Sequence, residues 1–506
     1  MKHITILLAL TLTSLHVFSQ KDEVAERYAG TITKEDLYDY LSILASDALE
    51  GRETGERGQK MAAAFISDHF EDLGLAGPVK DGQHTSYYQQ VNLYRTVPGD
   101  IYIKANGKRY NNFEDVVFYG ASSSEDEVAT KVVFAGNGMD VDYENVRTKG
   151  NSVLILAKNI QGTKSLIERA LKNEASTILI SGSKTDAEFK GLAQQFKSWL
   201  ENGTLSINKP EKSTEGSSVF FVSPSVAGEI FNTPYEKLEK IAETPAKLSK
   251  IKPAELTLKS TQEIQQVNTE NVLGYLEGTD KKDELIVITA HYDHIGRHNG
   301  EINNGADDDG SGTSSVMELA EAFAMAKKDG HGPRRSILFM LVTGEEKGLL
   351  GSEFYAENPV FPLENTVTDL NIDMIGRVDP KHADNPDYIY LVGADKLSSE
   401  LHQISEKINE TYTQFELDYT YNDEDHPDRI YYRSDHWNFA KNNIPVIFYF
   451  NGVHEDYHKP SDTIDKINFE LLTKRAHLVF HTAWVLANRD ERIVTDKLPA
   501  QEIDKD

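Results

Sequence analysis

The chain of 506 residues contains no cysteine. It therefore has no disulfide, no thiolate metal ligand, no cysteine nucleophile and no cysteine for a lipid anchor. Any bound metal ion must be held by histidine nitrogen and carboxylate oxygen.

Positive charge is also scarce, since 53 Lys and Arg stand against 81 Asp and Glu, which gives a formal net charge of −28. Such a surface repels nucleic acid and anionic membranes, so we expect neither as a partner. Most of the carboxylates are expected to lie on a solvated surface. Only those placed at the ends of strands need another explanation.

Long apolar runs are missing as well, because no stretch reaches the roughly 18 apolar residues that a transmembrane helix needs. The apolar run 4–17 is shorter, follows Lys2 and precedes a small residue, Ser19, at a possible cleavage site. Residues 1–19 are therefore predicted to be a signal peptide. We expect an exported protein, periplasmic or secreted, with no membrane anchor; its oligomeric state is not predicted.

The length suggests two or three domains. Residues 20–99 contain two amphipathic helical patterns that should pack on a larger body. Residues 100–255 carry short β-rich runs and one or two helices without a cluster of His and carboxylates, which predicts an inserted domain. Residues 256–490 are predicted to form the main domain and residues 491–506 a loose tail.

Strand and helix patterns alternate in the main domain. The predicted strands are 285–290, 336–342, 366–373, 388–392 and 445–450. Helical spacing of apolar residues occurs over 316–323 and 472–483. The alternation predicts a mixed sheet with helices on both faces, a three-layer α/β/α domain beside a smaller β-rich inserted domain.

Polar residues follow one predicted strand after another, where open α/β sheets bind their ligands. They are His291, Asp293, Glu345, Glu346, Asp373 and His458, together with the acidic turn 307–309. A Glu pair before a helix usually favours the helix dipole, and an Asp-rich turn is usually a cap. Their combination in one α/β domain indicates a metal site.

The residue types match zinc, and two histidines with at least three carboxylates exceed what one tetrahedral ion binds. A pair of Zn²⁺ ions sharing a carboxylate would use all of them. The predicted arrangement has Asp308 as the bridge, His291 and Asp373 on one ion, and Glu346 and His458 on the other. Asp293 is expected to accept a hydrogen bond from the other ring nitrogen of His291.

Glu345 is the predicted general base, since adjacent residues on a turn can point apart, one to the metal and one to the substrate. It would take a proton from the metal-bridged water and pass it to the leaving amine. The remaining histidines are expected to face solvent or to support the ligands. They are His294, His298, His426, His436 and His454.

Five segments appear in the order known from one family. They are 290–294 (AHYDH), 305–312 (GADDDGSG), 344–346 (GEE), 371–376 (NIDMIG) and 457–463 (YHKPSDT). Together they resemble the M28 family of zinc metallopeptidases, over about residues 33–75 and 269–486. The resemblance implies a phosphorylase/hydrolase-like α/β/α fold with two zinc ions, and the same ligands and base as above.

The resemblance further implies that Tyr457 stabilises the oxyanion and that Arg433 lines the substrate cleft. It also implies that the insert is a protease-associated domain, on the evidence of segments 132–138, 149–155 and 218–223. Asn151 departs from that pattern, in which Lys is more usual.

An exported aminopeptidase that hydrolyses N-terminal residues from peptides is the leading hypothesis. Glutaminyl cyclase activity with a single zinc, and carboxypeptidase activity, are alternatives on the same fold. A non-catalytic binding protein is a third alternative, although the complete set of ligands and Glu345 count against it.

Overall fold

The computed structural model describes residues 21–120, 124–159, 162–211 and 218–497. The predicted signal peptide, 1–19, and the end of the predicted tail, from residue 498, lie outside this range. The chain divides into two compact units. The main unit comprises the residues up to Val91 and from Asn268 onward, and the insert unit comprises Asn92–Val267.

The predicted insert boundaries, 100 and 255, fall within two long strands, β3 (Tyr88–Ala105) and β11 (Ala254–Leu276). Each strand continues from one unit into the other. An uninterrupted strand produces no turn signal and no change of composition. The division at Asn92 and Val267 was therefore not visible in the sequence.

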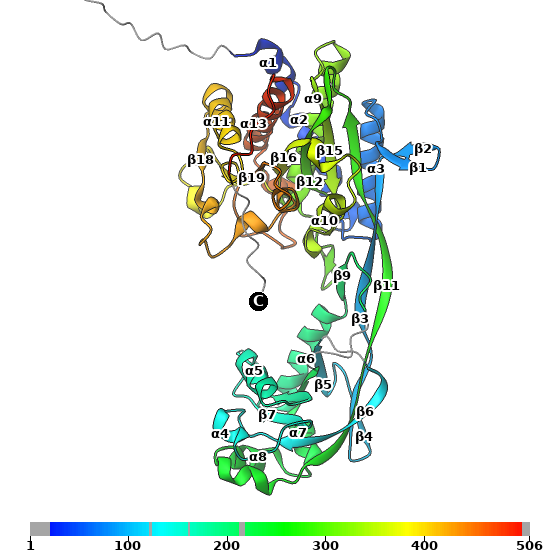
Figure 1. The fold of residues 1–506 in the computed structure, drawn as a ribbon, viewed down its shortest axis with the longest axis vertical. Helices are drawn as coiled ribbons and strands as arrows, with labels where there is room; N and C mark the ends of the chain where they lie inside the picture. The colour runs from blue at the N-terminus through cyan, green and yellow to red at the C-terminus, as the bar shows by residue number, and fades with distance from the viewer. Residues whose placement is uncertain (1–20, 121–123, 160–161, 212–217, 498–506) are drawn as a thin grey trace, which may run out of the picture. The chain divides into compact units, whose positions relative to one another are not determined.

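The sheet of the main unit is mixed, as predicted (Figure 1). Its strand order is β18 (Glu416–Asp418), β17 (Tyr388–Val392), β19 (Val446–Phe450), β16 (Thr366–Ile372), β12 (Lys281–His291), β15 (Arg335–Val342) and β11. The neighbours β15, β12, β16 and β19 run parallel, whereas β17 pairs antiparallel with β19 and β11 with β15. The five predicted strands are all confirmed.

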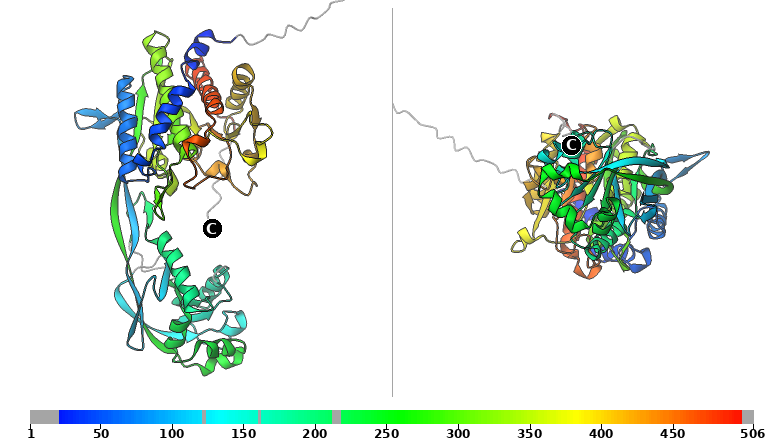
Figure 2. Two further views of the ribbon diagram at one scale, coloured as in Figure 1. Left: turned by 180° about the vertical axis from the view of Figure 1, so that it is seen from behind. Right: turned by 90° about the horizontal axis from the view of Figure 1, so that it is seen from below.

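Helices cover both faces of this sheet, which confirms the three layers. One face carries α1 (Glu23–Ala29), α2 (Lys34–Leu44), α3 (Arg57–Asp72), α9 (Gly312–Lys328), α11 (Ser399–Ile408) and α13 (Phe469–Asn488). The other carries α10 (Leu350–Glu357) and α12 (His436–Ala440). In the rear view of Figure 2, the blue N-terminal helices and the red α13 lie over the first face.

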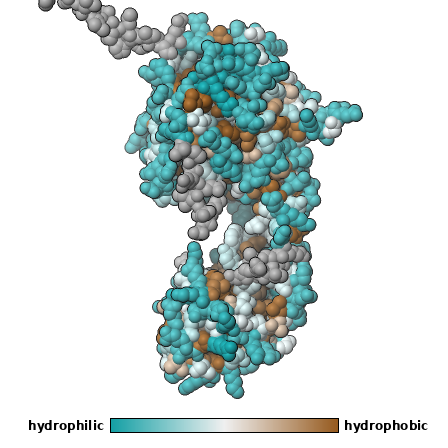
Figure 3. Space-filling view, in the orientation of Figure 1, coloured by the Kyte–Doolittle hydropathy of each residue, from teal (hydrophilic) through white to brown (hydrophobic). Residues whose placement is uncertain are grey.

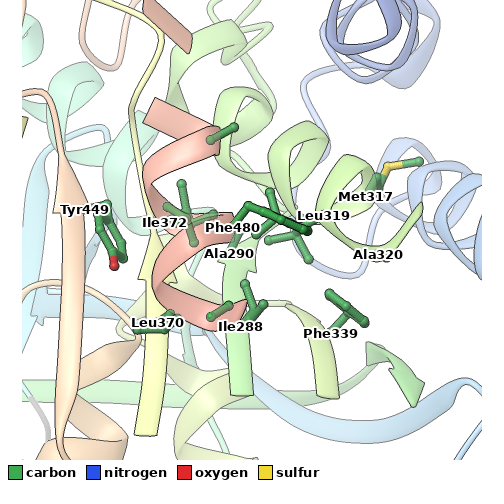
Figure 4. Packing of buried hydrophobic residues seen from close by; sticks show 14 of the residues in the cluster. Ile288, Ala290, Met317, Leu319, Ala320, Phe339, Leu370, Ile372, Tyr449 and Phe480 are labelled. Carbon is green, nitrogen blue, oxygen red and sulfur yellow. The ribbon is translucent and has the colours of Figure 1, made fainter. Parts of the chain in front are cut away.

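The period of two in a strand explains how β12 serves both layers. Ile286 and Ile288 belong to the first core, and Leu285 and Val287 to the second. Figure 4 shows Ile288 packed with Leu319 of α9 and Phe480 of α13. A strand buried on both faces is apolar throughout, which is why 285–290 reads as an unbroken hydrophobic run.

The insert unit has its own parallel strands, β6 (Ser124–Phe134), β7 (Ser152–Leu156), β8 (Thr177–Ser181) and β10 (Ser218–Val222). The remaining strands are β4 (Lys108–Asn111), β5 (Val116–Gly120) and β9 (Thr204–Ser206). The expectation of one or two helices is wrong. The helices are α4 (Asp140–Tyr143), α5 (Lys164–Lys172), α6 (Asp186–Leu200), α7 (Pro224–Ile230) and α8 (Tyr235–Ala242). Parallel strands need crossover segments, and α4, α5 and α6 lie in the crossovers between β6, β7, β8 and β10.

The described part of the predicted loose tail is anchored. Arg492 donates hydrogen bonds to the backbone carbonyls of Glu364 and Thr366, and Ile493 is buried. For residues 491–497 the expectation of a loose tail is therefore wrong. Among the described residues, no helix is long and apolar enough to cross a membrane. The visible face of the molecule is mostly hydrophilic (Figure 3).

Candidate metal centre

The parallel strands β15, β12, β16 and β19 bring the predicted ligands to one edge of the sheet. His291 of β12 is level with Val342 of β15, and Ile372 of β16 is level with Tyr449 of β19. Glu345, Glu346 and Asp373 follow directly after these strands. Residues far apart in sequence therefore meet at the carboxyl edge, as in other open α/β sheets.

Asp308 lies at the middle of the cluster with its carboxylate buried. Its Oδ1 is 3.2 Å from Nε2 of His291, and its Oδ2 is 3.1 Å from Nε2 of His458. The two oxygens of one carboxylate thus face two different histidines. This is the arrangement that a bridging ligand requires.

Two groups of possible ligands share Asp308. His291, Asp308 and Asp373 form the first, with His291 Nε2 3.6 Å from Asp373 Oδ1. Glu346 lies on the opposite side, where its Oε2 is 3.1 Å from Nε2 of His458. All five predicted ligands are therefore brought together.

His294 joins the second group with Asp308 and Glu346, which agrees with the expectation that it supports the ligands but also makes it a possible ligand. Its ring is buried and its Nδ1 is 2.7 Å from Glu346 Oε1 and 3.8 Å from Asp308 Oδ2. It does not face solvent, and neither do His436 and His454, which are also buried. The sequence gives His294 no signal beyond its place in the run 290–294.

Several buried atoms of the cluster have no hydrogen-bond partner, although they lie close together. They are His291 Nε2, His294 Nδ1 and Nε2, Asp308 Oδ2 and Glu346 Oε1. Buried polar atoms are rarely left unsatisfied. A cation among these nitrogen and oxygen atoms would satisfy them, and the donor set is one that zinc accepts.

Ligand spacing gives a further test of fit. Zinc–ligand bonds of about 2.1 Å at tetrahedral angles place neighbouring ligand atoms roughly 3.4 Å apart. The pairs of His291 with Asp308 and Asp373 are 3.2 and 3.6 Å apart, and those of His458 with Asp308 and Glu346 are both 3.1 Å. His294 fits less well, with separations of 2.7 and 3.8 Å.

The other nitrogen of His291, Nδ1, lies 3.0 Å from the backbone carbonyl oxygen of Asp293. A carbonyl only accepts, so Nδ1 carries the proton and the lone pair of Nε2 points toward Asp308. Asp293 therefore accepts the predicted bond, but through its backbone carbonyl and not through its carboxylate, whose Oδ1 is 3.9 Å away. That carboxylate instead accepts from the Glu345 amide at 3.2 Å and from Thr54 Oγ1 at 2.6 Å.

Glu345 and Glu346 begin the short turn Glu345–Lys347 and point to different groups. Glu345 Oε2 lies 3.8 Å from His291 Nε2. Burial raises the pKa of Glu345, and Glu346 and Asp373 raise it further against the effect of His291. Burial also acts to raise the pKa of Glu346, but the neighbouring imidazoles of His294 and His458 lower it to about 2. The two adjacent carboxylates therefore lie in different electrostatic surroundings.

The carboxylates of Asp307 and Asp309 accept hydrogen bonds from backbone amides. Of the three residues of the acidic turn, only Asp308 therefore belongs to the two groups of possible ligands. Asp307 Oδ1 accepts from the Gly376 amide at 2.7 Å. Asp309 Oδ1 accepts from the amides of Gly312 and Met374, at 2.9 and 3.1 Å. These bonds tie the acidic turn to the segment that follows β16.

A small pocket of about 40 Å³ opens beside the cluster. Its lining includes Asp308, Glu345, Asp373, Ile430, Arg433, Phe448, Phe450 and Tyr457. Burial raises the pKa of Tyr457, so its phenol keeps its proton and can donate a hydrogen bond. Arg433 is exposed at this pocket. Both residues that the resemblance added are thus next to the centre.

Strained backbone occurs at three residues around the centre. Arg52, Met374 and His458 have φ values of 50°, 61° and 55°, a region that side chains other than glycine seldom adopt. Such residues gather at functional sites, where the surrounding structure holds them in place.

The fold and this cluster together define a metallopeptidase type of α/β domain. Residues 271–483 match the model of peptidase family M28, and the chain carries an M28 domain. This confirms the resemblance seen in the sequence.

Curated relatives include the probable leucine aminopeptidase of Arthroderma benhamiae, 30% identical over 41% of this chain and 55% of the relative. Aminopeptidase YwaD of Bacillus subtilis is 25% identical over 54% of this chain and 56% of the relative. A probable zinc metalloprotease of Pyrenophora teres f. teres is 37% identical over 22% of each chain. The chain spans about half the length of the first two relatives.

Two solved structures share the fold along nearly the whole chain. An aminopeptidase from Aneurinibacillus sp. strain AM-1 gives a TM-score of 0.54 at 18% identity, covering 94% of this chain and 98% of its own. The zinc aminopeptidase BSAP from Bacillus subtilis gives 0.51 at 19% identity, covering 90% and 96%. At these identities the likeness establishes the fold.

Proposed function

We propose that the protein is an exported zinc-dependent exopeptidase, and specifically an aminopeptidase with two zinc ions. The observation that carries the proposal is the position of Asp308, whose two oxygens face two separate sets of ligands. The names of the relatives, leucine aminopeptidase, aminopeptidase and zinc metalloprotease, support the class of reaction.

The ligand spacing favours His291, Asp308 and Asp373 for one ion. It favours Asp308, Glu346 and His458 for the other, because His458 lies 3.1 Å from both carboxylates. Nδ1 of His294 is 2.7 Å from Glu346 Oε1 and 3.8 Å from Asp308 Oδ2, which fits a zinc ligand less well. We therefore propose that His294 positions Glu346 and does not bind the ion.

Bound zinc would supply a Lewis acid that polarises a carbonyl and makes water a better nucleophile at neutral pH. The Glu345 carboxylate borders the pocket and is free to accept the proton of the attacking water. It would then deliver that proton to the nitrogen of the leaving amine. The phenol of Tyr457 would donate a hydrogen bond to the carbonyl oxygen as negative charge develops there.

The pocket supports a preference for apolar side chains at the cleaved terminus. Ile430, Phe448 and Phe450 line it, and its volume of about 40 Å³ favours a small or medium side chain. Arg433 would contact the remainder of the substrate at the exposed end.

Two further proposals rest on sequence patterns. Export rests on the predicted signal peptide, 1–19. A role of the insert unit as a protease-associated module, limiting access of substrates or contacting them, rests on segments 132–138, 149–155 and 218–223. No observation favours the cyclase, carboxypeptidase or binding-protein alternatives.

The test compares substrates on zinc-loaded protein. Aminoacyl amides with a free N-terminus should be hydrolysed, whereas N-blocked aminoacyl amides should not. An N-blocked peptide with a free C-terminus should lose no C-terminal residue, and an N-terminal glutaminyl peptide should not be cyclised. Glu345→Gln serves as the control and should be inactive. Equal turnover of free and blocked amides would overturn the aminopeptidase proposal.

A further inference from the structure

The segment 51–54, which we name the brace, lies against the metal centre although it is outside the matched residues 271–483. The amide of Gly296 donates to the carbonyl of Gly51 at 3.0 Å, and the amide of His294 donates to that of Arg52 at 3.1 Å. Gly51 has a φ of 73°, and a Cβ there would collide with the backbone of Asn303 and Gly296. The brace therefore follows the chain closely where it leaves β12.

Arg52 is buried, with 1% of its surface exposed. Its guanidinium donates to the carbonyls of Tyr292 at 2.8 Å, Asn304 at 2.7 Å and Gly305 at 2.9 Å, and also to that of Leu44. Tyr292 directly follows the ligand His291, and Gly305 begins the loop that carries Asp308. One side chain thus joins the two segments that provide the first ligand pair.

Burying the charged guanidinium of Arg52 costs free energy. All of its described hydrogen bonds go to carbonyls, and a buried cation without a directly bonded acid is unfavourable unless negative charge lies near. Burial lowers the pKa of Arg52, while the carboxylates of Asp308, Asp309 and Asp293 oppose that effect. The left-handed backbone of Arg52 adds strain. The carboxylates of the centre therefore help to hold this cation in place.

Thr54 makes a separate connection. Its hydroxyl donates to Oδ2 of Asp293 at 2.6 Å, and Oδ1 of the same carboxylate accepts from the amide of Glu345 at 3.2 Å. Thr54 and Asp293 are both fully buried. The position of the Glu345 turn therefore depends on a bond that begins in the brace.

We propose that the brace has two separable positioning roles. Arg52 sets the spacing of His291 and Asp308 and thereby the affinity for zinc. Thr54, through Asp293, sets the position of Glu345 and thereby the rate of proton transfer. The inference rests on the proposed metal site and on the proposed hydrolysis.

The Arg52 role is tested by Arg52→Lys, which keeps the charge but cannot reach four carbonyls in a fixed geometry. The control is Arg335→Lys, because Arg335 is equally buried and donates to the carbonyls of Leu486 and Arg489, although it also pairs with Glu284. Zinc affinity of the metal-free proteins is measured by competition with a chromophoric chelator, beside the midpoint of thermal unfolding. Arg52→Lys should weaken zinc binding at least tenfold, and Arg335→Lys less than twofold.

The Thr54 role is tested by Thr54→Val, with Thr54→Ser to restore the hydroxyl. The control is Thr482→Val, because the Thr482 hydroxyl is also buried and donates to the carbonyl of Leu478 on the same helix. Thr54→Val should lower kcat about tenfold with KM and zinc affinity unchanged, and Thr54→Ser should recover kcat.

Unchanged zinc affinity in Arg52→Lys, or an equal loss in Arg335→Lys, would overturn the first role. Full kcat in Thr54→Val, or no recovery in Thr54→Ser, would overturn the second. Because zinc binding is measured without substrate, a failure of the proposed peptidase function can be distinguished from a failure of the proposed role of Arg52. A protein that shows the Arg52 effect but hydrolyses no peptide would refute the hydrolysis and the Thr54 role while supporting the Arg52 role.

Discussion

Both units of the chain contain parallel strands with crossover helices, yet the ends of their strands differ. In the main unit, β12, β15 and β16 lead into His291, Glu345 and Asp373. In the insert unit, β7 and β10 lead into Ala157 and Ser223, and no cluster of possible metal ligands was found among its described residues. In both units the architecture brings side chains together at the ends of the strands. Whether they can bind a metal ion depends on which residue types stand there.

Substitution of Asp308, the residue that the two ligand groups share, should have the largest effect on the chemistry that distinguishes the main unit from the insert unit. Asp308→Asn keeps the size of the side chain but removes the charge, so both ions should lose affinity. We expect activity to fall at least about 10⁴-fold and bound zinc to fall below one ion per chain. Peptidase assays and metal analysis by mass spectrometry measure the two effects. Zinc content near that of the wild type would contradict the bridging role.

Glu345→Gln should give the next largest effect, because it removes the proton acceptor but none of the proposed ligands. A loss of about 10³-fold in kcat is expected from general base catalysis. Zinc content should stay at the wild-type value. In the insert unit, Glu174→Gln changes an exposed acid paired with Lys149 and should alter kcat less than twofold. Retention of kcat in Glu345→Gln would contradict the mechanism.

Substitutions of His458 and His294 distinguish a metal ligand from a residue that supports a ligand. His458→Gln should remove one ion and lower activity about 100-fold, as expected for loss of a ligand. His294→Gln should lower it about tenfold, as expected for a residue that supports a ligand. Zinc titration with activity measured at each step separates the two. A reversed order would show that His294 is the ligand.

The smallest effect concerns a buried acid of the main unit that lies outside the metal centre. Burial raises the pKa of Glu318 to about 9, and Glu321 and Asp36 contribute. A carboxyl whose folded pKa exceeds its unfolded value of roughly 4.3 stabilises the fold below pH 4, and this contribution is lost as pH rises toward 9. The slope in that window is at most about 1.4 kcal/mol per pH unit.

Glu318→Gln should remove this pH dependence and raise the free energy of unfolding at pH 8.5 more than at pH 5.5. Urea unfolding at both values measures it, with the exposed Glu357→Gln as control. Zinc content should not change in either variant. An equal effect at the two pH values would show that Glu318 is ionised in the fold.

The sequence predicted the sheet well, and it singled out candidate ligands that the structure brings close together, because both leave side-chain patterns. Strands buried on both faces are apolar runs, and ligands must be His or carboxylate. Several contacts that it missed involve the backbone. Arg52 binds carbonyls of residues more than 200 positions away, and the Asp293 carbonyl binds His291. A carbonyl is present at every residue, so no residue type marks such a contact.

We have proposed that two zinc ions would share Asp308. The most direct test of this proposal is native mass spectrometry of the protein during zinc titration, with peptidase activity followed in parallel. We expect two zinc ions per chain and full activity only when both are bound. Full activity at one zinc ion per chain would contradict it.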